Sequence, residues 1–264
     1  MSMKKPKGEY AIQTVVNALR VLEAFHEEDE LGVTELSRRL SLHKNNVFRL
    51  LATLEERGYI DQHAGTERYG LGVKSLELGQ SFARNRSLLR SAVPKLTELV
   101  QGTGETAHLA VLRDHEVIHL CGDQKQRAVM TELRVGRYLP AHCTALGKVL
   151  LGCAPEGVRH AYDRERLVPH ALKARTQASI TDPDKLREHL QGVSVRGYAL
   201  DLGECDVGLC CAAAPVYGVD GKLCAALSVS GPEFRMAEEA LLGVVAPFVV
   251  ETADRLSRDL GYGA

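Results

Sequence analysis

The chain has 264 residues, of which 45% are hydrophobic and 25% charged, and its net charge is −1. This length favours two domains, and the composition is typical of a soluble globular protein rather than a disordered or fibrous one. The apolar runs are too short to cross a bilayer, and the basic N-terminus leads into no signal-peptide core. We therefore expect a cytoplasmic protein with no membrane segment.

The first sixty residues carry three helical patterns. The first covers residues 14–25, where apolar side chains recur every three or four positions. The second covers 33–40, with Thr34 as the expected N-cap, and the third covers 44–57, with Gly58 expected to end it. Two strand-like segments follow at 59–62 and 68–71, separated by a polar turn that contains glycine. Three helices followed by a hairpin predict a winged helix-turn-helix.

The rest of the chain mixes helical and strand-like patterns. Residues 74–99 are helical in pattern, with Pro94 expected to break the helix or to lie in a first turn. Further segments are predicted as strands at 107–112, 116–120, 209–216 and 222–230, and as helices at 144–151, 184–192 and 236–260. The expected fold class is α+β. The predicted parts are a basic, flexible arm at 1–11, a winged helix-turn-helix domain at 12–73, a linker helix at 74–87 and a second domain at 88–264.

The near-neutral net charge hides a local excess of positive charge. Residues 36–54 contain no acid, but they contain Arg38, Arg39, Lys44 and Arg49. A positive face of this kind is what contact with DNA phosphates requires. The predicted second and third helices therefore form a candidate DNA-binding surface.

The third helix begins with residue types that can read base edges. A recognition helix presents its N-terminal residues to the major groove, where Asn can bond adenine and Arg or Lys can bond guanine. The alternative is an ordinary solvated helix face, and Arg68 in the hairpin could equally be a packing residue. The predicted DNA-binding residues are Arg38, Arg39, Ser41, His43, Lys44, Asn45, Asn46, Arg49, Thr53 and Arg68.

Several segments resemble, in order and spacing, the IclR family of bacterial transcriptional regulators. They are residues 16–25, 31–37, 48–60, 139–148, 213–216 and 225–232, with Asp220-Gly221. The resemblance implies a C-terminal effector-binding domain with a GAF-like α/β fold, a dimer or dimer of dimers, and operator binding controlled by a small molecule, commonly an organic acid. Asn45-Asn46 replaces the Ser-Thr pair that the family often has, so the resemblance does not imply an operator sequence.

The residue pattern and the resemblance indicate one effector site. Strand alternation places Ser228 and Ser230 on one face, and Cys211 has the matching alternation on the preceding strand. Residues 144–146 begin a helix whose free N–H groups can hold a carboxylate. The resemblance adds Asp201. The alternative is that the serines bond each other or nearby backbone and that Cys211 belongs to the core. The predicted effector-binding residues are Thr144, Ala145, Leu146, Asp201, Cys211, Ser228 and Ser230.

An enzyme is not expected, and neither a cofactor nor a catalytic residue is predicted. The adjacent pair His142-Cys143 has no evident third group to orient it, and phosphate-binding, dinucleotide-binding and hydrolase motifs are missing from the sequence. The seven irregularly spaced cysteines do not fit a disulfide framework or a zinc site, and we interpret them as reduced, packed thiols. A metal- or redox-responsive regulator that uses the Cys-rich second half is the alternative function.

Overall fold

The computed structural model describes residues 11–26, 28–84, 87–127, 131–167 and 172–263. They form two compact units, which divide between residues 85 and 86. The basic arm predicted for residues 1–11 lies outside the described residues, apart from Ala11. No helix in the described part of the chain is long and apolar enough to cross a membrane.

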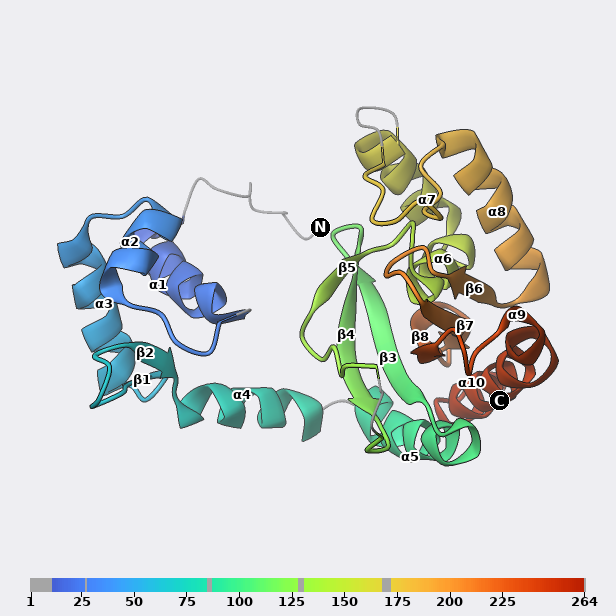
Figure 1. The fold of residues 1–264 in the computed structure, drawn as a ribbon, viewed down its shortest axis with the longest axis horizontal. Helices are drawn as coiled ribbons and strands as arrows, with labels where there is room; N and C mark the ends of the chain where they lie inside the picture. The colour runs from blue at the N-terminus through green and yellow to red at the C-terminus, as the bar shows by residue number, and fades with distance from the viewer. Residues whose placement is uncertain (1–10, 27, 85–86, 128–130, 168–171, 264) are drawn as a thin grey trace. The chain divides into compact units, whose positions relative to one another are not determined.

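The first unit contains the predicted winged helix-turn-helix (Figure 1). Its elements are α1 Gln13–Glu23 with a 3-10 turn at Ala24–His26, α2 Val33–Leu40, α3 Lys44–Glu56, β1 Ile60–Gln62, β2 Tyr69–Leu71 and α4 Val73–Arg84. The two strands pair antiparallel, with Ile60 opposite Leu71. The three helices and the hairpin close over one apolar cluster that includes Val21, Leu36 and Leu51.

The ends of the helices confirm one prediction and correct another. Gly58 follows α3 with a φ of +74°, a left-handed conformation that favours glycine, as expected for a residue that ends a helix. Thr34 is not the N-cap of α2. Gly32 occupies that position, and its N–H donates to Oε2 of Glu35 at 2.9 Å. The carboxylate of Glu35, in the first turn of α2, therefore accepts the backbone N–H of the N-cap residue. This bond caps the helix without an N-cap hydroxyl.

The second unit is a sheet covered by helices on both faces. Its strands are β3 Thr106–Arg113, β4 Glu116–Asp123, β5 Tyr138–Pro140, β6 Ala199–Leu202, β7 Leu209–Tyr217 and β8 Leu223–Pro232. Its helices are α5 Ser87–Thr103, α6 Ala145–Gly152, α7 Glu156–Tyr162 with a π turn at Asp163–Leu167, α8 Pro183–Arg196, α9 Glu238–Ala240 with a π turn at Leu241–Val245, and α10 Ala246–Asp259. The six strands are antiparallel in the order β5-β4-β3-β8-β7-β6. Helices α5 and α10 cover one face, and α6 to α8 lie on the other (Figure 1).

Two predicted helices differ from those observed, each at a segment that contains a proline. Pro94 neither breaks the helix nor lies in its first turn, because it lies inside α5, which runs from Ser87 to Thr103. The predicted final helix at 236–260 begins at Glu238 and contains the π turn just before Pro247. Proline has no N–H to donate to the preceding turn, which favours a wider turn at that point. The short elements β5, β6 and α7 were not predicted, because three to seven residues show too little periodicity.

Candidate effector cavity and nucleic-acid interface

Neighbouring strands bring polar side chains together on the α6 face of the sheet. Asp201 of β6 lies opposite Cys211 of β7, and Cys211 lies opposite Ser230 of β8. Ser228 of β8 lies opposite His108 of β3. Because alternate residues of a strand share a face, the side chains of these pairs lie together on one face of the sheet. They form a polar patch, here called the polar floor, on a face that is otherwise apolar.

A small cavity lies on this floor, under the first turn of α6. All seven predicted effector-binding residues line it, and five residues that sequence reasoning missed complete it: His108, His119, Arg134, Leu139 and Leu209. The volume that the centre of a water molecule can occupy is only about 20 Å³, so the cavity has room for about one water molecule. A larger ligand therefore requires its walls to move.

The first turn of α6 faces this cavity. The side chain of Thr144 caps the helix, accepting the N–H of Gly147 at 3.1 Å and donating to the carbonyl of Pro140 at 3.0 Å. Helix geometry gives the N–H groups of Ala145 and Leu146 no partner within the helix. A Cβ on Gly147 would collide with the backbone of Ala141, so glycine permits this close approach.

Asp201 is buried beside that helix N-terminus. Its Oδ1 accepts the N–H groups of Glu204 at 2.7 Å and Cys205 at 3.4 Å, which fixes the turn after β6. Burial raises the pKa of Asp201 to about 7. Behind it, the fully buried Lys148 forms an ion pair with Glu204. At neutral pH Asp201 can therefore either donate a hydrogen bond as the acid or accept one as the carboxylate.

Two imidazoles and the hydroxyl of Ser228 also line the cavity. His108 and His119 pack edge to face, with ring centroids 5.0 Å apart. Burial lowers the pKa of His108 to about 3 and that of His119 to about 4, so both are neutral at pH 7. Oγ of Ser228 is buried and has no hydrogen-bond partner among the described residues. An unpaired buried hydroxyl is costly, which indicates a site for a polar ligand.

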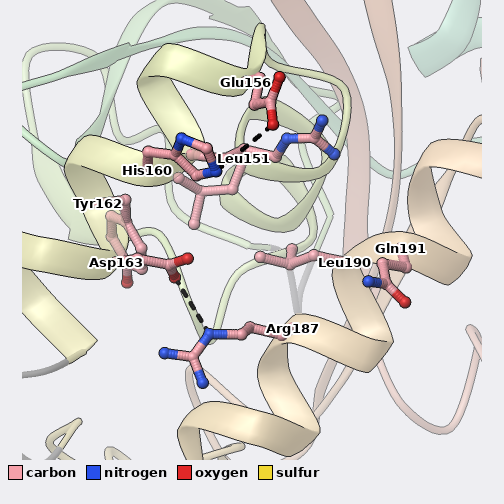
Figure 2. Close-up of a pocket in the computed structure, with 9 residues that line it drawn as sticks. Leu151, Glu156, His160, Tyr162, Asp163, Arg187, Leu190 and Gln191 are labelled. Carbon is pink, nitrogen blue, oxygen red and sulfur yellow. Dashed lines mark ion pairs between the residues drawn. The ribbon is translucent and has the colours of Figure 1, made fainter.

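A larger pocket of about 220 Å³ lies between α7 and α8 (Figure 2). Leu151 and Leu190 form its apolar part. Its rim carries two ion pairs, Glu156 with His160 and Asp163 with Arg187, each at 3.5 Å (Figure 2). None of the predicted site residues lines it. Because these charged groups are already paired, and Glu156 and His160 are also exposed, this pocket is a weaker candidate than the buried cavity.

The predicted DNA-binding side chains mostly point to solvent. Nine of the ten are exposed, and Arg68 is half-buried. His43 is the N-cap of α3, and its Nδ1 accepts the N–H of Asn45 at 3.3 Å. Thr53 donates its hydroxyl to the carbonyl of Arg49 at 2.8 Å. Lys44, Asn45 and Arg49 therefore lie on the open face of α3.

Two of the predicted arginines are held by other parts of the unit. Arg39 donates to the carbonyl of Ala24 at 3.0 Å and to Glu28 at 3.1 Å. Arg68 donates to the carbonyl of Glu30 at 2.9 Å and to Glu35 at 2.8 Å, which joins the hairpin to α2. Their geometry favours a structural contribution.

Phe48 was not predicted, although its side chain is 58% exposed beside Arg49. An aromatic residue outside the apolar positions 47, 50, 51 and 54 was the available signal. Apolar side chains on a recognition helix can contact thymine methyl groups.

The structure also bears on the enzyme and metal alternatives. The imidazole Nε2 of His142 lies 3.1 Å from the carbonyl of Lys173, whereas Sγ of Cys143 donates to the carbonyl of Pro140 at 4.0 Å. The two adjacent residues therefore do not form a nucleophile–base pair. Cys210 and Cys211 lie on opposite faces of the sheet. Within the described ranges, no group of three His, Cys, Asp or Glu residues could hold a metal ion.

Comparisons with known proteins agree with this architecture. Residues 14–64 match the IclR helix-turn-helix domain, and residues 80–258 match the bacterial transcriptional regulator IclR C-terminal domain. The chain is 34% identical over 255 residues to the HTH-type transcriptional regulator KdgR of Escherichia coli K12, covering 96% of this chain and 94% of that protein.

Solved structures give the same result. The IclR transcriptional regulator of Alicyclobacillus acidocaldarius superimposes with a TM-score of 0.84 at 28% identity, covering 96% of this chain and all of that one. An IclR homologue of Microbacterium hydrocarbonoxydans, solved with 4-hydroxybenzoate, superimposes with a TM-score of 0.81 at 25% identity, covering 94% and 98%. The chain belongs to the IclR family of bacterial transcriptional regulators, with a DNA-binding helix-turn-helix followed by an effector-binding domain.

Proposed function

We propose that this protein binds operator DNA through α2 and α3, in the bacterial cytoplasm, and that a small organic acid in the cavity under α6 changes that binding. The observation that carries the proposal is the convergence of all seven predicted effector residues on one buried cavity. The unpaired Oγ of Ser228 in that cavity supports a ligand with a polar group.

The cavity offers partners for a carboxylic acid. The N–H groups of Ala145 and Leu146 suit one carboxylate oxygen, because a helix N-terminus favours negative charge. The hydroxyls of Ser228 and Ser230 can donate to a second oxygen. Asp201 can bond a ligand hydroxyl or, in its protonated form, donate to the acid. The similar structure solved with 4-hydroxybenzoate supports the choice of acids as the first class to test.

On the DNA side, we assign base contacts to the start of α3 and backbone contacts to its surroundings. Lys44, Asn45, Asn46 and Arg49 are exposed and present the donors that base edges accept. Arg38, Ser41, His43 and Thr53 are exposed nearby and are proposed to contact phosphates or sugars. Arg39 and Arg68 are proposed to stabilise the DNA-binding surface through their hydrogen bonds within the first unit.

We also propose self-association, as a dimer or dimer of dimers. The exposed fractions of Ile12, Val15 and Leu19 on and beside α1 are 68%, 52% and 53%. These positions recur at the spacing of one helix face, and an exposed apolar stripe favours a second copy as its partner. Leu19→Glu should shift the mass measured by light scattering towards the monomer. An unchanged mass would exclude this stripe as the interface.

The central experiment measures effector and operator together. A thermal-shift screen of short aliphatic and aromatic acids should find acids that raise Tm, since a ligand specific to the folded state stabilises it. DNA fragments selected by the protein from genomic DNA then serve as operators in fluorescence anisotropy. The expected result is that an acid which raises Tm also changes operator affinity. If every stabilising acid leaves operator affinity unchanged, the proposal is wrong.

The thiols of Cys143 and Cys205 shift each other's pKa, that of Cys143 upwards and that of Cys205 downwards, and this proximity favours a redox-responsive regulator as the second candidate. Cys143 lies in the segment before α6 and Cys205 in the turn after β6, and both segments border the cavity. A free-thiol count before and after hydrogen peroxide, with operator affinity measured in parallel, separates this candidate from the metabolite sensor. Loss of two thiols together with altered operator binding would support it.

A further inference from the structure

We infer that Arg134 determines the specificity of the cavity for anionic effectors, by pairing with the acid group of the effector in exchange for Asp206. This inference rests on the proposed function above. Arg134 is not one of the seven predicted effector-binding residues. Its proposed role is to make the cavity bind a charged ligand in preference to a neutral one.

Arg134 lies at the wall between the cavity and solvent. Together with Leu209 it lines both the inner cavity and a surface groove of about 210 Å³. Its backbone N–H donates to Nε2 of His108 at 3.3 Å, which holds this segment against the cavity. A ligand that enters from the groove must therefore pass the Arg134 side chain.

Arg134 also supplies the positive charge of the site. It is the one Lys or Arg among the described residues that line the cavity, and both lining histidines are neutral at pH 7. Its side chain is only 17% exposed, so its field is weakly screened by water. A carboxylate that enters a cavity already containing Asp201 needs a cation of this kind nearby.

Arg134 now pairs with Asp206, and it can exchange this partner for the carboxylate of an effector at a small cost in free energy. Nη2 of Arg134 lies 2.6 Å from Oδ2 of Asp206, and Nη2 of Arg175 lies 3.1 Å from the other oxygen, Oδ1. Arg175 is itself anchored to the carbonyl of Cys205 at 3.0 Å. Asp206 is 38% exposed and keeps Arg175 when Arg134 leaves, so no buried charge is left unpaired.

An alternative role for the pair is that of a clasp, in which Arg134 stays on Asp206 and merely closes the cavity over the ligand. The two roles make opposite predictions for Asp206. If Asp206 competes with the effector for Arg134, its removal tightens acid binding. If the pair is a clasp, removal of either partner weakens binding.

The experiment compares acids with amides of the same shape, on the full-length protein. The probes are 4-hydroxybenzoate with 4-hydroxybenzamide, and pyruvate with pyruvamide, titrated calorimetrically into wild type, R134Q, R134K, D206N and R137Q. Arg137 is the matched control, because it lies in the same segment but is 49% exposed, is paired with Glu132 and does not line the cavity.

We expect R134Q to weaken acid binding by roughly tenfold or more, since it removes a partly buried charge pair, and to leave amide binding nearly unchanged. R134K should retain the preference for acid over amide, which also controls for a folding defect in R134Q. D206N should tighten acid binding, and R137Q should behave as wild type.

The inference is overturned if D206N weakens acid binding, or if R134Q loses acid and amide alike. If acids bind wild type and R134Q equally, this inference fails while the proposed function stands. If no acid or amide binds wild type or D206N, both fail.

Discussion

Ser228 on β8 lies directly opposite His108 on β3, and the buried Oγ of Ser228 makes no hydrogen bond among the described residues. Because the hydroxyl has no partner to lose, Ser228→Ala should leave the free energy of unfolding within about 1 kcal/mol of wild type, or raise it. The same substitution should weaken the response to the effector, measured as the acid-dependent rise in Tm. Operator binding without effector should not change.

Ser257 is the matched control for this prediction. It is equally buried, but its Oγ accepts the N–H of Tyr217 at 3.0 Å and donates to the carbonyl of Ala253 at 2.8 Å. Ser257→Ala should therefore cost about 1–2 kcal/mol by urea denaturation, while its acid response stays intact. A large stability loss in Ser228→Ala, or an unchanged acid response, would contradict the assignment of Ser228 to the ligand.

Arg49 projects from the exposed face of α3. Arg49→Ala should reduce specific operator affinity by roughly tenfold to hundredfold without unfolding the protein, because it removes the proposed base contact, which is worth about 1–3 kcal/mol. Arg57→Ala removes the same charge from an exposed position at the other end of the helix, so it should have a much smaller effect. Anisotropy titrations at one fixed salt concentration measure both. Equal losses would indicate that Arg49 contributes charge alone.

The buried ion pair of Lys148 and Glu204 should dominate the stability of the second unit around α6. Lys148→Met leaves Glu204 buried and unpaired, which should cost about 3–5 kcal/mol. The double variant Lys148→Met, Glu204→Gln removes both charges and should recover most of that loss. Urea denaturation of the two variants and Glu204→Gln gives the coupling directly. If the double variant is no more stable than Lys148→Met, the unpaired charge is not the cause.

The two neutral histidines should make the protein sensitive to acid. The pKa values of His108 and His119, about 3 and about 4, lie below the value of 6.5 expected in the unfolded chain. Between pH 6.5 and 4 the unfolded chain therefore binds more protons at these sites, so their contribution to stability is lost as the pH falls through this window. Asp201, with its pKa raised to about 7, acts in the opposite direction, because between about pH 7 and 4 the folded protein keeps a proton at this site that the unfolded chain releases.

His108→Gln tests this balance while keeping an acceptor for the Arg134 N–H. Near pH 5 it should reduce the slope of unfolding free energy against pH by about 1.4 kcal/mol per pH unit, the contribution of one proton. Asp201→Asn should steepen the same slope. Denaturation curves between pH 4.5 and 7 measure both effects, and a slope unchanged in His108→Gln would show that this histidine is not held neutral by burial.

Local patterns predicted much of the architecture. The periodicity of residues 44–57 and the glycine that follows define α3, and strand alternation correctly placed Ser228 and Ser230 on the face of Cys211. Both signals depend on neighbours within one or two turns of the chain, which is why a single sequence carries them. The prediction for Pro94 was wrong, because whether a proline ends a helix depends on the packing of the whole helix and not on the neighbouring residues alone.

The residues of the cavity that sequence reasoning missed come from contacts across long separations. Arg134 lies in a segment without periodicity, and its partner Asp206 is 72 positions away. Lys148 and Glu204 are separated by 56 positions. The sequence by itself therefore determined the two-unit plan, the third helix of the winged helix-turn-helix and the polar face of β8. Only the tertiary structure decided which buried charges meet and which hydroxyl has no partner, because those outcomes depend on packing between distant segments rather than on local conformation.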